Sequence, residues 1–392
     1  MLSRSSGRRR TRRSTAVAAV LAAAAAGGLV QPAHAGDGTH PGQPLQHGIQ
    51  QLVDTPGGPP GVIAVLGRGD RTEVYRAGAG DLGTGRPPRT TDHMRLASVS
   101  KAYSGAVALR LVDQGRLRLD TTIGERLPAL PAAWCDVTLR QLLQHTSGLP
   151  DFSGSAAFRQ ILGTDPHHVF DSRKLLDFVA GKPLLFPAGA RYQYSNSDNI
   201  AVALMAEAAT GRRYEDLLQQ LVYQPLHLRQ TSLPQGFRLP RPSLHGYAVD
   251  PPAPPEDVTE LLGSSGVWAS GAVVATPDDL TAFIRGYAGG GLLSPHTRKQ
   301  QLTFVPGGAS EPAGPGDNAA GLAVFRYTTR CGVLYGHTGN TAGYTQLAAA
   351  TLDGRRTLTF SVTTQVSKST EPALLARLRA VQEDFACALL RP

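Results

Sequence analysis

The stretch RLASVSK, residues 95–101, places a lysine three residues after Ser98 in a chain that has only five lysines. Each residue of an α-helix turns the chain by about 100°, so side chains three positions apart emerge as neighbours. If a helix begins here, the Ser98 hydroxyl and the Lys101 amine lie side by side. A serine nucleophile with an amine partner needs this pairing. Because S-x-x-K is short enough to occur by chance, the rest of the chain must support it.

The composition is that of a globular protein with an unusual N-terminus. At 392 residues and 41% hydrophobic content, the chain can bury a large core, as one big domain or two intimate ones. The formal net charge is +9, but six arginines lie within the first thirteen residues. Removing residues 1–35 takes away these six charges and no acidic residue, and nine minus six leaves +3. We therefore expect no nucleic-acid partner for the mature chain.

Residues 1–35 have the pattern of a secretory signal peptide. The arginine-rich start runs into an Ala/Val/Leu-rich stretch at about 16–30, and an A-H-A cleavage pattern ends at Ala35. About 15 apolar residues fall short of the ~20 that a membrane-spanning helix needs. The sequence predicts a secreted protein, cleaved near Ala35, with no stable membrane anchor. The two arginines at 12–13 leave both the general and the twin-arginine export routes open.

The chain has three cysteines, Cys135, Cys331 and Cys387. In an oxidising compartment an odd number permits one disulfide and one free thiol. We predict a disulfide between Cys331 and Cys387, which would join the start of a late strand to the last helix; three buried, reduced thiols are the alternative. No Cys/His spacing resembles a zinc site, and the pair His167-His168 is typical of a solvated loop. We expect no metal and no cofactor.

Both ends of the chain have strand patterns. Residues 61–78 contain two β-rich runs around a G-R-G-D turn, which predicts a hairpin. Residues 345–364 contain two more around an Asp-Gly turn, with a further candidate strand at 331–339 before them and a helical pattern from 373 after them. We therefore expect one antiparallel sheet built from both ends, with helices at the termini.

The middle of the chain has helical patterns. Residues 100–115 end in a glycine typical of a helix C-terminus, and residues 197–211 begin with serine and also end in glycine. The sequence predicts an α+β fold with an active site in the cleft between two lobes of one catalytic domain. The sheet lobe would comprise 36–125 and 260–392, and the all-α lobe 126–259.

Two more motifs follow S-x-x-K at wide separations. Residues 194–196, Y-S-N, are the only Y-x-N in the chain, and residues 337–339 are H-T-G. H-x-G occurs twice more, but both copies precede Ser98 and lie in the leader and the polar segment after it. The order and wide separation of the three motifs therefore carry more information than any one of them.

This order resembles that of the serine penicillin-binding proteins and β-lactamases. The Y-x-N form is similar to class C β-lactamases and closest to the secreted serine D-alanyl-D-alanine carboxypeptidases of actinobacteria. A histidine in place of lysine in the third motif favours the carboxypeptidases. The resemblance covers about residues 60–390 and rests on four flanking segments: LLQHTSGLPD at 142–151, FPAGARYQYSNSDN at 186–199, ASGAVVATPDDL at 269–280 and LYGHTGNTAGY at 334–344.

Two segments near these motifs are interpreted as structural. Ser197-Asp198-Asn199 would indicate a class A β-lactamase, but that class pairs S-D-N with K-T-G, and no lysine precedes Thr338. We therefore interpret Ser197 as the N-cap of a helix. The resemblance implies that His145, in H-T-S-G-L, belongs to a turn-forming scaffold.

The resemblance implies a catalytic role for five residues. Ser98 would attack the substrate carbonyl and become acylated. Lys101 would take the proton, or would stay charged and favour a Tyr194 phenolate that takes it; the sequence leaves both open. Asn196 would orient Lys101 and the substrate amide. His337 would lie on an edge strand facing the cleft and pass protons or charge through Tyr194.

The resemblance also implies contacts with substrate. The backbone N–H groups of Ser98 and Asn340 would form an oxyanion hole. We expect Thr338 and Gly339, in the third motif, to contact substrate, and Trp268 to line the pocket.

The pattern departs from the carboxypeptidases where they bind the terminal carboxylate. Phe325 stands where the resemblance leads us to expect an arginine, and Arg326 follows it. Successive strand residues face opposite sides, so Arg326 reaches substrate only if a bulge re-aims it. Asn340 replaces the hydroxyl residue expected after H-T-G. Both departures concern recognition of the carboxylate and not acyl transfer.

We predict a secreted, monomeric serine D-alanyl-D-alanine carboxypeptidase that acts on cell-wall peptides and binds penicillins. An esterase, D-aminopeptidase or β-lactamase on the same fold is the second hypothesis. A non-catalytic sensor of cell-wall peptides or β-lactams is the third. The presence of Ser98, Lys101 and Tyr194 argues against a sensor, because a pure binder needs no activated nucleophile.

Overall fold

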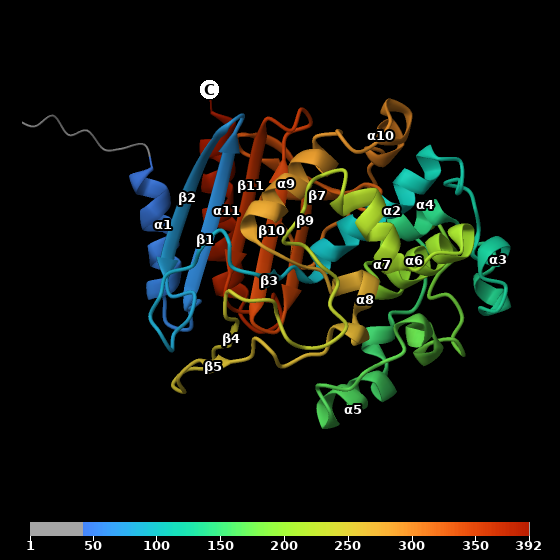
Figure 1. Ribbon diagram of the computed structural model, residues 1–392, viewed down its shortest axis with the longest axis horizontal. Helices are drawn as coiled ribbons and strands as arrows, with labels where there is room; N and C mark the ends of the chain where they lie inside the picture. The colour runs from blue at the N-terminus through green and yellow to red at the C-terminus, as the bar shows by residue number, and fades with distance from the viewer. Residues whose placement is uncertain (1–41, 392) are drawn as a thin grey trace, which may run out of the picture. The chain divides into compact units, whose positions relative to one another are not determined.

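An antiparallel sheet of seven strands organises residues 42–391, the part of the chain that the computed structural model describes. The predicted signal peptide lies outside these residues. The strands are β1 (Gly61–Arg68), β2 (Arg71–Gly78), β7 (Asp317–Ala320), β8 (Phe325–Thr329), β9 (Gly332–Thr341), β10 (Tyr344–Ala350) and β11 (Arg356–Val362). Their order across the sheet is β2-β1-β11-β10-β9-β8-β7 (Figure 1).

The two ends of the chain meet within this sheet, where β1 lies between β2 and β11. A two-residue turn joins β1 to β2, and Gly69 in it has φ +58°, a left-handed conformation that suits glycine. On its other side β1 pairs with β11, so that Val62 lies opposite Val362. In Figure 1 the N-terminal hairpin accordingly lies beside the C-terminal strands. The predicted α+β fold with an antiparallel sheet from both ends is confirmed.

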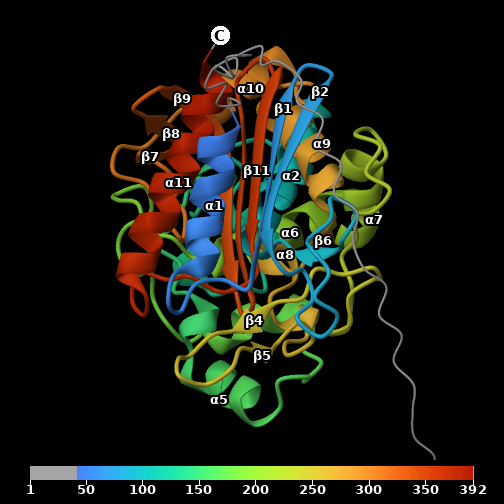
Figure 2. The ribbon, with the colours of Figure 1, turned by 90° about the vertical axis from the view of Figure 1, so that its left-hand side faces the viewer.

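Helices cover both faces of the sheet, which explains why β1 is apolar at consecutive positions. Val62, Ala64 and Leu66 belong to the core cluster that includes the first and last helices, whereas Ile63 and Val65 belong to the cluster on the helical side. Figure 2 shows α1 (Gln43–Asp54) and α11 (Pro372–Leu390) side by side over the sheet. On the opposite face, α9 (Pro277–Ala288) packs against β10 and β11.

The helical lobe is centred on α2 (Ser100–Asp113), which packs against α6 (Asn196–Thr210) and α8 (Trp268–Gly271). Glycines in the left-handed conformation follow two of these helices: Gly115 after α2 and Gly211 after α6. The helix α2 also contacts β9, so it lies between the other helices and the sheet, and the boundary at residue 126 stays a prediction. The described residues belong to one compact unit.

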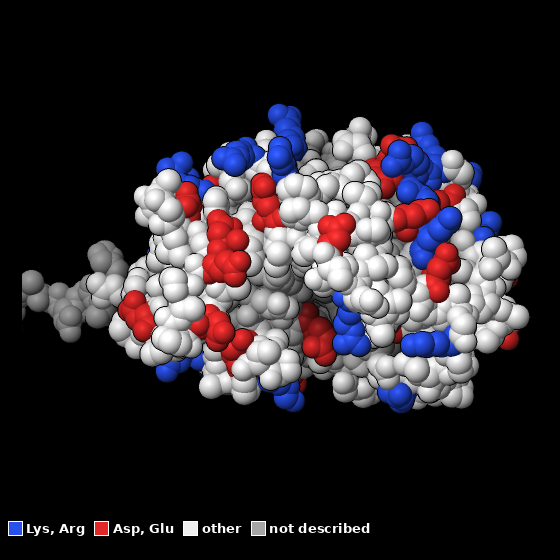
Figure 3. All heavy atoms as spheres, turned by 90° about the horizontal axis from the view of Figure 1, so that it is seen from below, with Lys and Arg blue, Asp and Glu red and all other residues white. Residues whose placement is uncertain are grey.

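Shorter elements complete the two lobes. The remaining helices are α3 (Ile123–Arg126), α4 (Leu139–Leu143), α5 (Ala156–Thr164), α7 (Tyr214–Leu218) and α10 (Pro295–Gln301), with 3-10 turns η1 (Ala97–Val99) and η3 (Phe152–Gly154). Two small ladders pair β3 (Met94–Arg95) with β6 (Val274–Ala275) and β4 (Tyr247–Ala248) with β5 (Glu256–Asp257). Within residues 42–391 no helix is both long and apolar enough for a membrane span. Acidic and basic side chains are interspersed on the face that Figure 3 shows, around a hollow.

The prediction that Ser197 caps a helix is wrong. The helix α6 begins at Asn196, with Ser195 as its N-cap residue, so Ser197 already lies inside the first turn. The Ser197 hydroxyl donates to the Pro150 carbonyl (2.7 Å) and accepts from the Phe152 N–H (2.9 Å). This serine therefore fixes the segment before η3 against α6.

A disulfide joins Cys331, directly before β9, to Cys387 in α11, with a Cα–Cα distance of 5.0 Å. It is the pair predicted from the sequence, and Cys135 is free. The bridge closes a loop across 56 positions. It therefore ties the last helix to the strand that follows the β8–β9 turn.

Replacing both Cys331 and Cys387 by alanine should lower the free energy of unfolding. The crosslink restricts the unfolded chain, and a disulfide of this kind typically contributes about 2–4 kcal/mol. Urea denaturation followed by circular dichroism measures the change. Cys135→Ser is the matched control and should leave the unfolding midpoint in place; an equal loss in the control would contradict the prediction.

Candidate active site

Ser98 lies in η1, the tight turn between β3 and α2. The preceding Ala97 has φ +48°, a left-handed conformation that is uncommon for a residue with a side chain. The turn is tied to the segment before β6, because the Leu96 N–H donates to the Val273 carbonyl (3.0 Å) and the Val273 N–H donates to the Ser100 hydroxyl (3.0 Å). The Ser98 side chain is thereby held at the start of α2.

Lys101 is fully buried below Ser98. Its Nζ lies 3.1 Å from Ser98 Oγ, 2.7 Å from Asn196 Oδ1 and 2.8 Å from the Ser270 carbonyl oxygen. The amide and carbonyl oxygens only accept hydrogen bonds, whereas the serine hydroxyl also donates. Burial lowers the pKa of Lys101 to about 7. An uncharged amine would donate its two N–H groups to the oxygens and receive the Ser98 proton on its lone pair.

Asn196 is fixed from the side opposite Lys101. Its amide nitrogen donates to Asp151 Oδ2 (3.0 Å) and to Ser153 Oγ (3.1 Å), and its backbone N–H also donates to Asp151 (3.0 Å). The carbonyl oxygen therefore faces Lys101, in agreement with the predicted orienting role. Both amide hydrogens are already bonded, so the predicted hydrogen bond from Asn196 to a substrate amide has no free donor.

Tyr194 lies against Lys101, with its ring centroid 4.9 Å from Nζ. Among the described residues its hydroxyl has no hydrogen bond of normal geometry. Burial raises the pKa of Tyr194 well above its usual value, although the nearby Ser98 hydroxyl lowers it. The free protein therefore holds Tyr194 as a neutral phenol, and the electrostatics favour Lys101 as the base.

His337 lies on β9, an inner strand and not the edge strand that we expected, although the pairing of β9 with β8 stops at Gly336, one residue before His337. Its side chain is completely buried and is not part of the pocket wall. Nδ1 donates to the Thr338 carbonyl (2.6 Å), and Nε2 has no partner among the described residues. Burial lowers the pKa of His337 to about 3, so the imidazole is neutral.

The end of β9 is open on the side of β8, because their pairing stops where Phe325 lies opposite Gly336. On the other side, Thr341 and Tyr344 close a two-residue hairpin, and Asn340 lies opposite Thr345. Hydrogen-bonded and non-hydrogen-bonded pairs alternate from such a closing pair, so the Asn340 N–H points away from β10. This is the direction that the predicted oxyanion hole requires.

A pocket of about 840 Å³ opens beside this strand end, and Ser98, Tyr194, Asn196 and Asn340 line it. Lys101 lies buried beneath its floor. Thr338 does not reach the pocket, because it is buried and its hydroxyl donates to the Pro312 carbonyl (2.5 Å).

Two predicted pocket residues lie elsewhere. Trp268 is buried in the helical lobe, where its Nε1 donates to Glu215 (3.1 Å). Arg326 stacks on the Phe304 ring, with 5.0 Å between guanidinium and centroid, whereas the preceding Phe325 packs edge-on against His337. The alternation along β8 thus directs Arg326 away, and no bulge re-aims it: β8 stays in register with β9. Neither residue lines the pocket.

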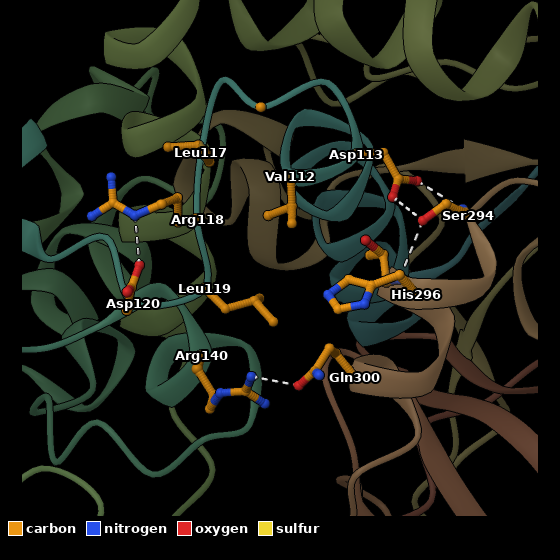
Figure 4. A pocket seen from close by; sticks show the side chains of 12 residues that line it. Val112, Asp113, Leu117, Arg118, Leu119, Asp120, Arg140, Ser294, His296 and Gln300 are labelled. Atoms are coloured by element: carbon orange, nitrogen blue, oxygen red, sulfur yellow. Dashed lines mark hydrogen bonds and ion pairs between the residues drawn. The ribbon is translucent and has the colours of Figure 1, made fainter.

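A second pocket, of about 540 Å³, lies between the end of α2 and α10 (Figure 4). Asp113 accepts from the Ser294 hydroxyl (2.5 Å) there, and none of the predicted site residues lines it. Within residues 42–391 no group of three or more His, Cys, Asp or Glu side chains is placed to hold a metal ion.

Sequence reasoning missed several residues of the pocket and its surroundings. His145 has φ +55°, as a turn residue does, but its ring lies 4.5 Å from the Tyr194 ring. Asp198, whose carboxylate contacts His145 Nδ1, is the middle residue of the S-D-N segment and lies two positions after Asn196. Glu311 and Lys368 line the pocket from two loops. For these residues the useful sequence signal was the H-T-S-G-L-P-D segment, which begins with His145 and ends with Asp151, the partner of Asn196.

The model of the family named Beta-lactamase matches residues 49–383. The chain belongs to the beta-lactamase family. It is therefore a serine hydrolase of the group that includes the penicillin-binding proteins, as the three motifs predict.

Relatives differ in the substrates that their names state. The chain is 24% identical to a penicillin-binding protein of Bacillus subtilis over 327 residues, 80% of this chain and 70% of that protein. It is 28% identical to esterase EstB of Burkholderia gladioli over 333 residues, 71% of this chain and 81% of that protein. A D-stereospecific amidohydrolase from Streptomyces sp. has a similar structure, with a TM-score of 0.72 and 27% identity over 82% of this chain and 94% of that one.

Replacing Gly339 by alanine should impair catalysis. A Cβ at this position would lie 2.2 Å from the Leu96 carbonyl oxygen and 3.1 Å from the Ser98 nitrogen, so β9 would have to move away from η1. A displacement of about 1 Å can lower kcat/KM by about 100-fold. Hydrolysis of a chromogenic ester measures the loss. Gly163→Ala is the control, because an added Cβ there meets nothing within 4 Å; equal activities of the two variants would contradict the prediction.

Acylation should depend on pH with a midpoint near the lowered Lys101 pKa of about 7. If Lys101 is the base, the acylation rate falls about tenfold for each pH unit below this midpoint. Stopped-flow acylation by a chromogenic β-lactam measures the profile. A rate that is flat from pH 5 to 8 would exclude Lys101 as the titrating base.

The burial of Lys101 should also make the free energy of unfolding depend on pH. The folded protein releases the Lys101 proton near pH 7, whereas the unfolded chain keeps it up to about pH 10.4. Between these values the unfolded state binds more protons, so the free energy of unfolding rises with pH. Lys101→Met should lack this rise, and urea denaturation of both proteins at pH 7 and 9 tests the difference.

Proposed function

We propose that the protein is a secreted serine D-alanyl-D-alanine carboxypeptidase that forms an acyl enzyme on Ser98. The observation that carries the acyl-transfer chemistry is the contact of 3.1 Å between Lys101 Nζ and Ser98 Oγ at a fully buried lysine. A relative named as a penicillin-binding protein supports the choice of substrate.

The mechanism follows from the contacts. Ser98 Oγ attacks the carbonyl carbon of the scissile bond while its proton passes to Lys101 Nζ. The N–H groups of Ser98 and Asn340 stabilise the oxyanion. The proton then moves to the departing D-alanine amine by way of the Tyr194 hydroxyl, which gives its own proton to the amine and takes the proton held by Lys101. Water hydrolyses the ester on Ser98 by the same route. The open end of β9 offers backbone groups to which an extended peptide can bind as an added strand.

A charged residue that binds the terminal carboxylate must come from the pocket itself, because Arg326 lies elsewhere. Three cationic side chains line the pocket: Arg159, Lys368 and Arg379. The two arginines already donate to backbone carbonyls, whereas among the described residues no ion pair or hydrogen bond ends on the Lys368 ammonium, which comes from the loop after β11. We assign carboxylate recognition to Lys368.

The second candidate is a D-aminopeptidase or D-amino-acid amidase, favoured by Glu311. This carboxylate lines the same pocket, and no hydrogen bond or ion pair within residues 42–391 ends on it. Burial raises the pKa of Glu311, and the nearby charge of Lys368 lowers it. Asp151, the other acid in the pocket, already accepts from Asn196 and Ser153. A substrate with a free α-ammonium would therefore meet Glu311.

The two candidates are separated by matched variants on matched substrates. Release of D-alanine from diacetyl-lysyl-D-alanyl-D-alanine is compared with hydrolysis of D-alanine p-nitroanilide, whose amine is free. For the carboxypeptidase, Lys368→Met raises KM for the tripeptide about tenfold and Glu311→Gln has little effect, as expected for one lost ionic contact. The converse pattern on the anilide would establish the second candidate.

Ser98→Ala is the control for both and should release nothing. Covalent labelling of this variant by penicillin would overturn the acyl-enzyme assignment. A stable β-lactam adduct on the wild type, with no turnover of any peptide or ester, would instead support a sensor.

We also propose export with cleavage near Ala35, because residues 1–35 have a basic start, an apolar stretch and an A-H-A cleavage pattern. N-terminal sequencing of the protein from culture medium tests this. A monomeric mature protein is part of the proposal, and light scattering measures it.

A further inference from the structure

A buried His–Asp–Ser cluster lies behind the catalytic side chains. His145 Nδ1 is 2.7 Å from Asp198 Oδ2, and the Ser147 hydroxyl donates to Asp198 Oδ1 at 2.5 Å. The side chains of His145 and Asp198 are 4% and 0% exposed. Since the histidine and serine come from the turn after α4 and the aspartate from α6, the cluster joins two segments of the helical lobe.

His145 holds Tyr194 from three directions. Its carbonyl oxygen accepts from the Gln193 N–H (2.8 Å), and its Nδ1 lies 3.4 Å from the Ser195 N–H, which points at it. The residues on both sides of Tyr194 are thus bonded to one histidine. The imidazole also lies against the phenol ring, with centroids 4.5 Å apart and planes inclined by 37°.

The proton of the pair lies in the 2.7 Å contact between His145 Nδ1 and Asp198 Oδ2. The Ser195 N–H is the weaker partner, because its 3.4 Å separation from Nδ1 exceeds the usual hydrogen-bond range and the ring nitrogen has one lone pair. Burial raises the pKa of Asp198 well above its usual value and lowers the pKa of His145 to about 3, which agrees with a neutral acid and a neutral imidazole. A neutral pair adds no net charge beside Lys101.

We propose that His145, held by Asp198, is a positioning residue that fixes the Tyr194 phenol against Lys101 and Ser98. This inference rests on the proposed acyl transfer at Ser98. It goes beyond the turn-forming role that the sequence implied for His145. The pair acts through Tyr194 and does not contact substrate, because neither member lines the pocket.

A double-mutant cycle between His145→Asn and Tyr194→Phe tests the proposal. The asparagine amide takes the place of Nδ1 and keeps a partner for Asp198, but removes the ring behind Tyr194. We expect kcat for a chromogenic ester to fall about 10- to 100-fold in His145→Asn, with KM within about threefold, because orientation is lost and binding is not. In the Tyr194→Phe background the same substitution should change kcat by less than about twofold.

Equal losses in both backgrounds would overturn the proposal, because they would show that His145 acts independently of Tyr194. Urea denaturation of each variant establishes that it is folded. If His145→Asn does not fold, Ser147→Ala completes the same cycle, since it loosens Asp198 without changing the backbone bonds to residues 193 and 195. Activity in Ser98→Ala would instead refute the acyl enzyme, so the two failures are distinguishable.

Two further measurements test the location of the proton. Asparagine at position 198 can donate to Nδ1 and accept from Ser147, as the neutral acid does, so Asp198→Asn should keep at least about tenfold more activity than Asp198→Ala. Comparable losses in the two variants would contradict a neutral acid.

The pH profile provides the second measurement. The titratable groups that face the pair are Lys101, Asp151, Tyr192, Tyr194 and His337. Because a neutral pair contributes no charge to them, His145→Asn should leave the pH midpoint of acylation within about 0.3 units of the wild-type value. A shift of a full unit would show that the pair is charged and would overturn this part of the proposal.

Discussion

The burial of one lysine is the constraint on which the active site depends. A charged ammonium without access to water is unfavourable, so the enclosure that removes Lys101 from solvent also favours its uncharged form. Three segments supply that enclosure: η1 with Ser98, α6 with Asn196, and α8 with Ser270. The fold must therefore bring distant parts of the helical lobe together before the serine has a base. The same contacts then decide the direction in which the proton moves.

The sheet provides the other half of the site by bringing a strand against the nucleophile. Since β9 is an inner strand, its position is fixed by pairing on both sides up to Gly336, and only its last residues are open. Gly339 lets this backbone approach the turn that carries Ser98. The proposed oxyanion donors therefore come from a rigid sheet and a rigid turn, and such preorganisation makes hydrogen-bond donors effective.

The motif residues of the site and the antiparallel sheet formed by both chain ends could be predicted from the sequence, because both depend on local spacing and alternation. Side chains whose orientation is set by distant packing were not predictable in this way. Trp268 lies one position after Val267, which does line the pocket, and yet points into the helical lobe. His145 has a turn conformation that the sequence indicated, but its contact with Asp198 joins segments 53 positions apart. The local sequence pattern at His145 therefore predicts the backbone conformation but not the residue that its side chain contacts.

The alternation along β9 positions the two loops whose charges we assign to substrate recognition. His337 and Gly339 occupy one set of positions, and Gly339 faces the turn of Ser98. Thr338 and Asn340, on the other set, each hold a loop: the Thr338 hydroxyl binds Pro312, next to Glu311, and the Asn340 amide donates to the Val366 carbonyl (2.9 Å), two residues before Lys368. One strand thus fixes the oxyanion donor and both charged loops. On the proposed assignment, the charges of these two loops select the substrate, while the strand and the buried lysine serve acyl transfer.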